Sequence, residues 1–205
     1  MKFRIAVPVA ALALGLTVAG CSSTNPTNTG STAATSSGSS ASSTAAPSAS
    51  GSQIVAPFND VDVRFVQGML PHHMQAVRNA EIEVATGGAP EVKAIAQKIL
   101  DGQRVEIATM QGFLKTFGAP KQQAPQDQQA VWDKNTADLQ AAATPKERDV
   151  IFLTNMVPHH SAAIPMAQLD ITQGKYPQAQ ALAMQIKTTQ RMEIVEMNMM
   201  IRART

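Results

Sequence analysis

The chain has 205 residues, which is enough for one folded domain with a sizeable core and additional segments. Its 17 basic residues face 15 acidic ones, and two of the basic residues, Lys2 and Arg4, lie within the first 20 positions, so the remainder carries 15 of each sign. No basic excess is left to indicate a nucleic-acid partner. A single cysteine excludes a disulfide within the chain and a cluster of thiolate metal ligands.

The first 20 residues have the pattern of a secretory signal: Lys2 and Arg4, an apolar run over residues 5–19, and small residues before Cys21. The stretch VAGC at residues 18–21 resembles the lipobox of bacterial lipoproteins. This resemblance implies that Cys21 becomes the lipidated first residue of the mature protein, held at the cell membrane on its extracytoplasmic side. Secretion without a lipid is the alternative.

Residues 22–52 are almost entirely Ser, Thr, Ala, Gly, Asn and Pro, with no charged and no large apolar side chain. Such a segment cannot bury enough surface to offset the entropy of ordering it. With Cys21 it forms a predicted tether over residues 21–54, and a chain of this type spans roughly 30 Å on average. The folded domain is then expected over residues 55–205.

The folded region contains a tandem repeat at a constant offset of 87 residues, with one copy at about 58–117 and the other at about 145–204. Two copies indicate a pair related by a pseudo-twofold axis, because a solenoid needs at least three repeats. The matched positions include these residues of the first copy, each identical 87 residues later: Asp62, Phe65, Met69, Pro71, His72, His73, Ala76, Ala80, Gly87, Pro90, Gln103, Arg104, Glu106, Ile107 and Met110.

Apolar residues recur at three- and four-residue steps in each copy, and each copy has a breaker at its centre, over residues 87–90 and 174–177. This pattern predicts one helical hairpin per copy. TPKE at residues 144–147 resembles a capping box that starts the third long helix, and residues 127–142 are expected to form a short connecting helix. We therefore predict an all-α fold, an antiparallel four-helix bundle made of two tandem hairpins.

All four histidines lie in the repeat as two adjacent pairs. A hairpin that turns at residues 88–89 places His72 and His73 level with Gln103 to Glu106, and Met69 near Met110. The same register in the second copy brings the equivalent residues together: His159, His160, Gln190, Glu193, Met156 and Met197. Both copies can then direct imidazoles into a common central layer.

These residues point to a transition-metal site. Imidazole suits copper, zinc, iron and nickel, whereas thioether sulfur favours Cu(I), and 11 methionines in the chain favour copper over zinc or another transition metal. The alternative is that the methionines fill the core and the histidines are buried polar groups satisfied by glutamate. The candidate ligands are His72, His73, His159, His160, Met69, Met156, Met110, Met197, Glu106 and Glu193.

The same motif resembles a bacterial family known as domain of unknown function 305, in the ferritin-like superfamily. Its pattern is Phe and Met before a His-His pair, then Gln-x-x-Glu-Ile-x-x-Met on a second helix, and both copies match it. The resemblance implies a ferritin-like four-helix arrangement in exported proteins, some of them linked to periplasmic copper binding and tolerance. One departure is Asn79, which stands where the second copy has Met166, and it predicts unequal metal affinity in the two copies.

The sequence lacks the motifs of the common enzyme classes. No acidic residue stands three positions before a histidine, as a carboxylate-bridged di-iron site requires, and no nucleophile or phosphate-binding motif is present. The leading hypothesis is a non-catalytic, membrane-tethered protein that binds or sequesters copper outside the cytoplasm. An envelope interaction module with structural or pH-sensing histidines is a second hypothesis, and a metal-dependent redox enzyme is a third.

Overall fold

The computed structural model describes residues 57–204, so the predicted signal segment, Cys21 and the tether lie outside the described residues. Within residues 57–204 no strand occurs, which confirms the predicted all-α fold. No helix in this range combines the length and apolar character needed to cross a membrane. The helices are α1 (Asp60–Thr86), α2 (Pro90–Phe117), α3 (Gln126–Ala141), α4 (Pro145–Gln173) and α5 (Pro177–Arg202).

The helices begin where local chemistry favours a start. Asn59 caps α1 by accepting hydrogen bonds from two backbone N–H groups of the first turn. Thr144 caps α4 through the N–H of Glu147 at 3.1 Å, as predicted. The return bond differs from a standard capping box, because the Glu147 carboxylate accepts from the N–H of Ala143 at 2.9 Å, one residue before the cap. Proline occupies the first position of α2, α4 and α5, where its missing N–H costs nothing.

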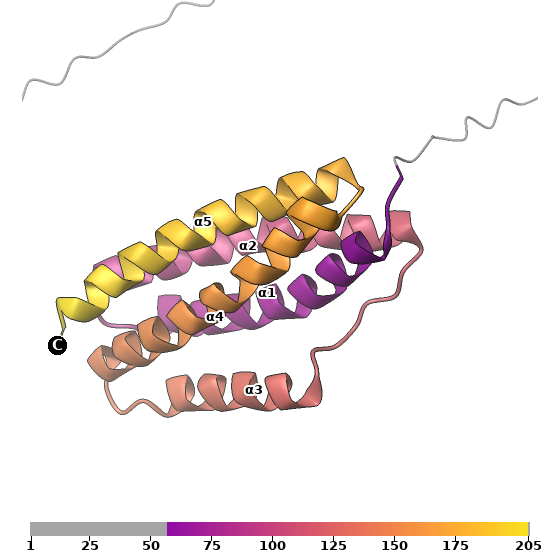
Figure 1. The fold of residues 1–205 in the computed structure, drawn as a ribbon. Helices are drawn as coiled ribbons and strands as arrows, with labels where there is room; N and C mark the ends of the chain where they lie inside the picture. Colours follow the sequence, from indigo (N-terminus) through magenta and orange to yellow (C-terminus); the bar gives the residue numbers. More distant parts are fainter. Residues whose placement is uncertain (1–56, 205) are drawn as a thin grey trace, which may run out of the picture. The chain divides into compact units, whose positions relative to one another are not determined.

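The four long helices form a bundle of two antiparallel hairpins. α1 pairs with α2 and α4 pairs with α5, while α1 also packs along α4 and α2 touches α5 (Figure 1). The predicted connecting helix is α3, which lies on the outside of the bundle against α1 and α4 (Figure 1). α1 continues through Pro71 and α4 through Pro158 and Pro165 without a break in either helix.

The apolar core consists of two clusters that follow one another along the bundle. The first includes Phe65, Met69 and Met110, and the second includes Phe152, Met156 and Met197, among other residues. In α1 the residues of the two clusters are separated by His72 and His73, and in α4 by the second histidine pair. The histidines therefore form a polar layer between two apolar halves of the core.

Each hairpin caps the second helix of the other hairpin. The Asp149 carboxylate, at the start of α4, accepts hydrogen bonds from the N–H groups of Gly88 (2.7 Å) and Ala89 (2.9 Å), just before α2. The Asp62 carboxylate, at the start of α1, accepts from residues 175 and 176 just before α5, at 3.0 Å in each case. Neither α2 nor α5 has a side-chain cap from its own N-cap residue, so these contacts supply the missing acceptors.

A second carboxyl group joins each of these caps. Burial, together with the hydrogen bond and negative charge of Asp149, raises the pKa of Glu83 to about 8. Burial and the charge of Asp62 likewise raise the pKa of Asp170 to about 7. A side chain at Gly174 would bring its Cβ within 2.7 Å of the Asp170 carboxyl and 2.6 Å of the Asp62 carboxylate, so the turn needs glycine there. Each end of the bundle thus holds a buried pair of carboxyl groups, one of which has a raised pKa.

Candidate metal centre

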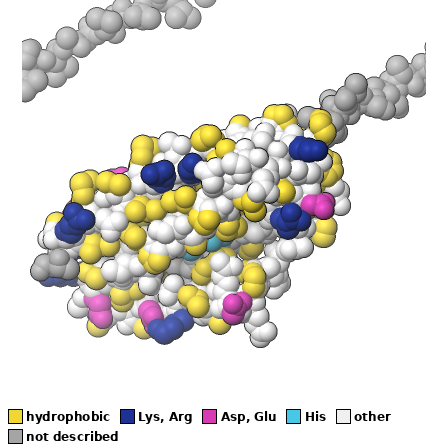
Figure 2. Space-filling model, viewed as in Figure 1, with side chains coloured by type: hydrophobic (Ala, Val, Ile, Leu, Met, Phe, Trp, Pro, Cys, Tyr) yellow, Lys and Arg dark blue, Asp and Glu magenta, His cyan; other side chains and the backbone are white. Residues whose placement is uncertain are grey.

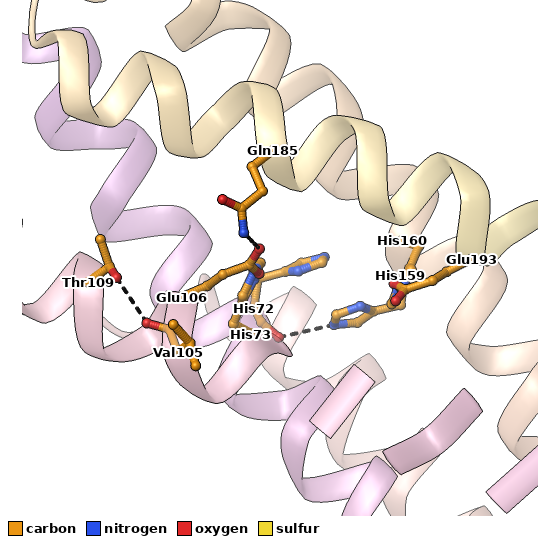
Figure 3. Close-up of polar contacts among 9 residues, drawn as sticks. All are labelled: His72, His73, Val105, Glu106, Thr109, His159, His160, Gln185 and Glu193. Carbon is orange, nitrogen blue, oxygen red and sulfur yellow. Dashed lines mark hydrogen bonds and ion pairs between the residues drawn. The ribbon is translucent and has the colours of Figure 1, made fainter. Parts of the chain in front are cut away.

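His72 of α1 and His159 of α4 meet at the centre of the bundle. Their ring centroids are 3.6 Å apart, with 31° between the ring planes. The Nε2–H of His159 donates to the backbone carbonyl of His72 at 3.1 Å (Figure 3). Because a carbonyl can only accept, this bond places the His159 proton on Nε2 and leaves Nδ1 with a free lone pair.

The other histidine of each pair points to a glutamate on the second helix of its own hairpin. His73 Nε2 lies 2.8 Å from Glu106 Oε2, and His160 Nε2 lies 2.9 Å from Glu193 Oε2 (Figure 3). The hairpin register predicts both contacts. A carboxylate acceptor holds the imidazole proton on Nε2 and leaves Nδ1 free, as in many protein sites where a carboxylate orients a metal-binding histidine.

The stacked histidines are neutral at physiological pH. Burial, with the adjacent imidazoles of His73 and His160, lowers the pKa of His72 to about 3. Burial and the imidazole of His72 hold the pKa of His159 well below its usual range. Neutral imidazole is the form that binds a metal, because only the unprotonated nitrogen has a lone pair to donate.

The layer contains ring nitrogens without a hydrogen-bond partner. They are both ring nitrogens of His72 and the Nδ1 atoms of His73, His159 and His160. Buried polar atoms are normally paired, and each unpaired one costs about 1–3 kcal/mol. Five such atoms in one layer fit a group of ligands better than a set of satisfied core residues.

The four candidate methionine ligands are all buried, at most 1% exposed. Met69 and Met110 lie in the first apolar cluster and Met156 and Met197 in the second, so the thioethers sit on both sides of the histidine layer. As arranged, the described residues contain no group of three or more His, Cys, Asp or Glu side chains that could hold a metal ion. A metal would therefore need thioether ligands or a rotation of the stacked rings.

Trp132 of α3 is a neighbour of the centre that sequence reasoning did not assign to it. Its ring lies 5.6 Å from His72, edge-on at 77°, and 6.0 Å from His159. Trp132 is 6% exposed and covers the stacked pair from outside the bundle. The sequence feature that could have indicated this role is the position of Trp132, the only tryptophan of the chain, in the segment between the two copies.

The departure at Asn79 has a structural explanation. Thr136 of α3 donates a hydrogen bond to the Asn79 side-chain oxygen at 2.7 Å, and both side chains are buried. Asn79 thus fastens the connecting helix to the first copy. The equivalent Met166 instead packs near Gly68 of α1, where an added Cβ would lie 3.0 Å from the methionine methyl group. The two copies therefore differ where α3 covers only one of the two equivalent positions.

The chain is a helical bundle with two equivalent His–Glu pairs buried at its centre, one in each hairpin. The chain is a member of the family described as domain of unknown function 305, whose sequence profile matches residues 62–201. The family membership predicted from the histidine motif is confirmed. No match is found among the curated proteins.

Solved structures similar to this chain include members of the same family. A domain of unknown function 305 fragment from Deinococcus radiodurans has 28% identity and a TM-score of 0.66, and covers 72% of this chain and 99% of its own. A secreted protein of the family from Streptomyces coelicolor has 25% identity and a TM-score of 0.63, with 70% and 92% covered. CopM in its Cu(I)-bound form has 28% identity and a TM-score of 0.60, with 69% and 96% covered.

Proposed function

We propose that the protein binds and buffers copper outside the cytoplasm, tethered to the cell membrane through lipid on Cys21, and that it catalyses no reaction. The observation that carries this proposal is the layer of four buried histidines, with five unpartnered ring nitrogens between two buried methionine pairs. Neutral imidazole with thioether sulfur is a donor set that suits Cu(I). CopM, which has this fold, has been solved with Cu(I), Cu(II) and silver, which supports the choice of metal.

In this proposal the imidazoles of both copies are the principal ligands. Glu106 and Glu193 hold His73 and His160 in the tautomer that presents Nδ1, or ligate directly when an imidazole turns away. The thioethers complete the coordination, because the imidazoles and carboxylates do not converge as a group of three in the described residues. Bound metal would supply the positive charge that the four free imidazole lone pairs, one on each neutral histidine, attract.

The test is equilibrium dialysis of the purified protein against Cu(I) and Zn(II), followed by elemental analysis. The unchanged protein is expected to retain metal in a fixed ratio. His72→Ala with His73→Ala should leave the second copy partly loaded, and the same change in His159 and His160 as well should abolish retention. Thr188→Ala, on the exposed face of α5, is the control. Retention by the fourfold variant equal to that of the control would sink the proposal.

The interaction-module alternative has one observation in its favour, the two His–Glu hydrogen bonds that already pair His73 and His160 without a metal. Melting curves separate the two functions. A metal that binds only the folded protein stabilises it by about 2.7 kcal/mol at a hundredfold excess over the dissociation constant. If the histidines are purely structural, copper leaves the melting temperature unchanged, and the alanine variants lose stability whether or not metal is present.

The proposed tether has its own test. Cells expressing the full chain are grown with a labelled fatty acid and fractionated. The unchanged protein should carry the label and sediment with membranes, whereas Cys21→Ala should lose the label and appear in the soluble extracytoplasmic fraction. Membrane association with label in the Cys21→Ala protein would contradict lipidation at this residue and leave the metal proposal unaffected.

A further inference from the structure

A cavity of about 250 Å³ lies between α2 and α5, next to the glutamates of the candidate metal centre. Several of its lining residues are equivalent positions of the two copies, so the cavity lies where the second helices of the two hairpins face each other. The residues that the argument uses are Gly102, Gln103, Glu106, Thr189, Gln190 and Glu193.

Two glutamines in this cavity have no protein partner for their amide groups. Gln103 is 3% exposed and Gln190 is 2% exposed, and neither the oxygen nor the nitrogen of either amide has a hydrogen-bond partner. Amides in this state bind water or a polar solute, because an unpaired buried amide is costly. The two equivalent amides make the cavity a polar pocket in a largely apolar bundle.

The cavity connects to the imidazoles through the carboxylates. Glu106 and Glu193 line it, and one oxygen of each accepts from His73 or His160. The second oxygen of Glu106 lies 3.4 Å from the amide nitrogen of Gln185, also in the lining. The cationic side chain in the lining, Lys98, is half exposed and paired with Glu196. The cavity therefore offers carboxylate and amide groups that favour a cation, and each carboxylate also contacts a histidine.

On the opposite side the layer is largely covered by side chains. Trp132 covers the stacked histidines there, and His159 is 8% exposed; Figure 2 shows only a small area of histidine on that face. The larger cavity on that side, of about 590 Å³, is lined by Trp132 and Pro71 but by none of the four histidines or the two paired glutamates.

We propose that the cavity between α2 and α5 is the entrance through which a metal cation reaches the histidine layer. This inference rests on the proposed function. Gln103 and Gln190 replace part of the hydration shell of the cation, and Glu106 and Glu193 pass it to the imidazoles that they already hold. The carboxylates thus have a transfer role in addition to orienting the rings.

Glycines on α2 provide a matched pair of variants. A Cβ at Gly102 or at Gly112 would meet no atom within 4 Å, so both positions accept a side chain. Gly102 lines the cavity, whereas Gly112 lies exposed further along the same helix. Gly102→Phe narrows the entrance, and Gly112→Phe makes the same helix substitution elsewhere. Thr189→Phe narrows the entrance from α5 and serves if Gly102→Phe does not fold.

Trp132 provides the readout, because it is the only tryptophan of the chain and lies within 6.0 Å of His72 and His159. Ag(I), a soft monovalent ion like Cu(I), is mixed with the full chain in a stopped-flow instrument, and quenching of Trp132 fluorescence is followed. Gly102→Phe or Thr189→Phe should slow uptake about tenfold or more, with a dissociation constant within about twofold of the unchanged protein, because uptake and release slow together. Gly112→Phe should match the unchanged protein.

The outcomes separate this proposal from the one on which it rests. If the unchanged protein binds no Ag(I) or Cu(I) at equilibrium, both the proposed function and the entrance are overturned. If it binds metal, and folded Gly102→Phe and Thr189→Phe load as fast as Gly112→Phe, the metal function stands and the entrance is wrong.

Discussion

The centre and the two ends of the bundle both bury duplicated titratable groups, but they use them differently. At the ends, Asp62 and Asp149 accept backbone hydrogen bonds at helix starts, and beside each lies a second buried carboxyl group with a raised pKa. At the centre, five imidazole nitrogens have no partner. At the ends the caps from Asp62 and Asp149 stabilise the fold, and only the second carboxyl groups, Glu83 and Asp170, lack a hydrogen-bond partner beyond the carboxylate beside them. At the centre the ring nitrogens without a partner belong to all four histidines, and they serve no helix cap, so their use lies outside the fold.

The largest effect on stability should come from removing the helix cap at one end of the bundle. Asp149→Ala removes both acceptors at the start of α2 and is expected to lower the free energy of unfolding by about 3 kcal/mol. Urea denaturation measures the loss, and the folded fraction should bind metal with unchanged affinity. Asp138→Ala is the control, since its partner Lys134, at 2.6 Å, is exposed, and it should cost less than about 1 kcal/mol. If both variants lost the same free energy of unfolding, the proposed structural role of the buried carboxylates at the ends would be wrong.

The reverse experiment removes a polar pair from the centre. His160→Leu with Glu193→Leu replaces a buried pair by apolar side chains, so the free energy of unfolding should stay within about 1 kcal/mol of the unchanged protein or rise. Metal affinity should fall at least about tenfold, because the variant removes one candidate ligand together with the carboxylate that orients it.

Glu193→Leu alone is the matched variant for this experiment. It leaves the His160 Nε2–H without an acceptor and should cost about 1–3 kcal/mol. Thermal denaturation compares the single and double variants. A double variant less stable than the single one would show that the centre, like the ends, is needed for folding.

The thioethers can be tested separately from the imidazoles. Leucine preserves methionine volume and removes only the sulfur, so replacing all four buried candidates, Met69, Met110, Met156 and Met197, should weaken Cu(I) binding about tenfold while sparing Zn(II). The control replaces Met184, Met192 and Met199, which are 49%, 56% and 59% exposed. Competition with a chelator measures both affinities. Unchanged Cu(I) affinity in the buried variant would assign these methionines to the core alone.

The smallest expected effect is the pH dependence of stability that Glu83 causes at one end of the bundle. The folded-state pKa of Glu83, about 8, lies above the ordinary value of 4.5, so the folded protein holds a proton that the unfolded chain releases. Its stabilising contribution is complete below about pH 4.5 and is lost as pH rises through 8. Glu83→Gln removes this titration and should stabilise the protein at pH 8.5 by at least about 1 kcal/mol relative to the unchanged chain. Denaturant unfolding from pH 5 to pH 8.5 measures the slope, and equal slopes for both proteins would contradict the assignment.

Much of the fold and half of the candidate centre follow from local sequence patterns. Apolar periodicity and the breakers at residues 87–90 and 174–177 predict the hairpins, and the register within one hairpin predicts that His73 faces Glu106. These relations hold within a hairpin, where the turn sets which residues are level. The family match follows from the same histidine motif.

Contacts between particular residues of different hairpins could not be predicted in this way, although the sequence predicts a common layer of imidazoles. The contact of His72 with His159 and the cap that Asp62 places on α5 join residues 87 or more positions apart. Periodicity shows which face of a helix is buried but not how two hairpins are rotated and shifted against each other, because that depends on the packing of the whole core. Trp132 was missed for the same reason, since its place depends on where α3 docks.

The exchange of caps between hairpins defines what a lone hairpin lacks: an acceptor for the start of its second helix and a cover for its apolar face. Two identical hairpins about a twofold axis supply both to each other, so the architecture is that of a homodimer whose subunits have been fused. Fusion keeps the halves at an effective concentration on the order of millimolar and frees them from remaining identical. Asn79 and Met166 are an example of this divergence. Asn79 binds α3 through Thr136, whereas the equivalent Met166 has no such role.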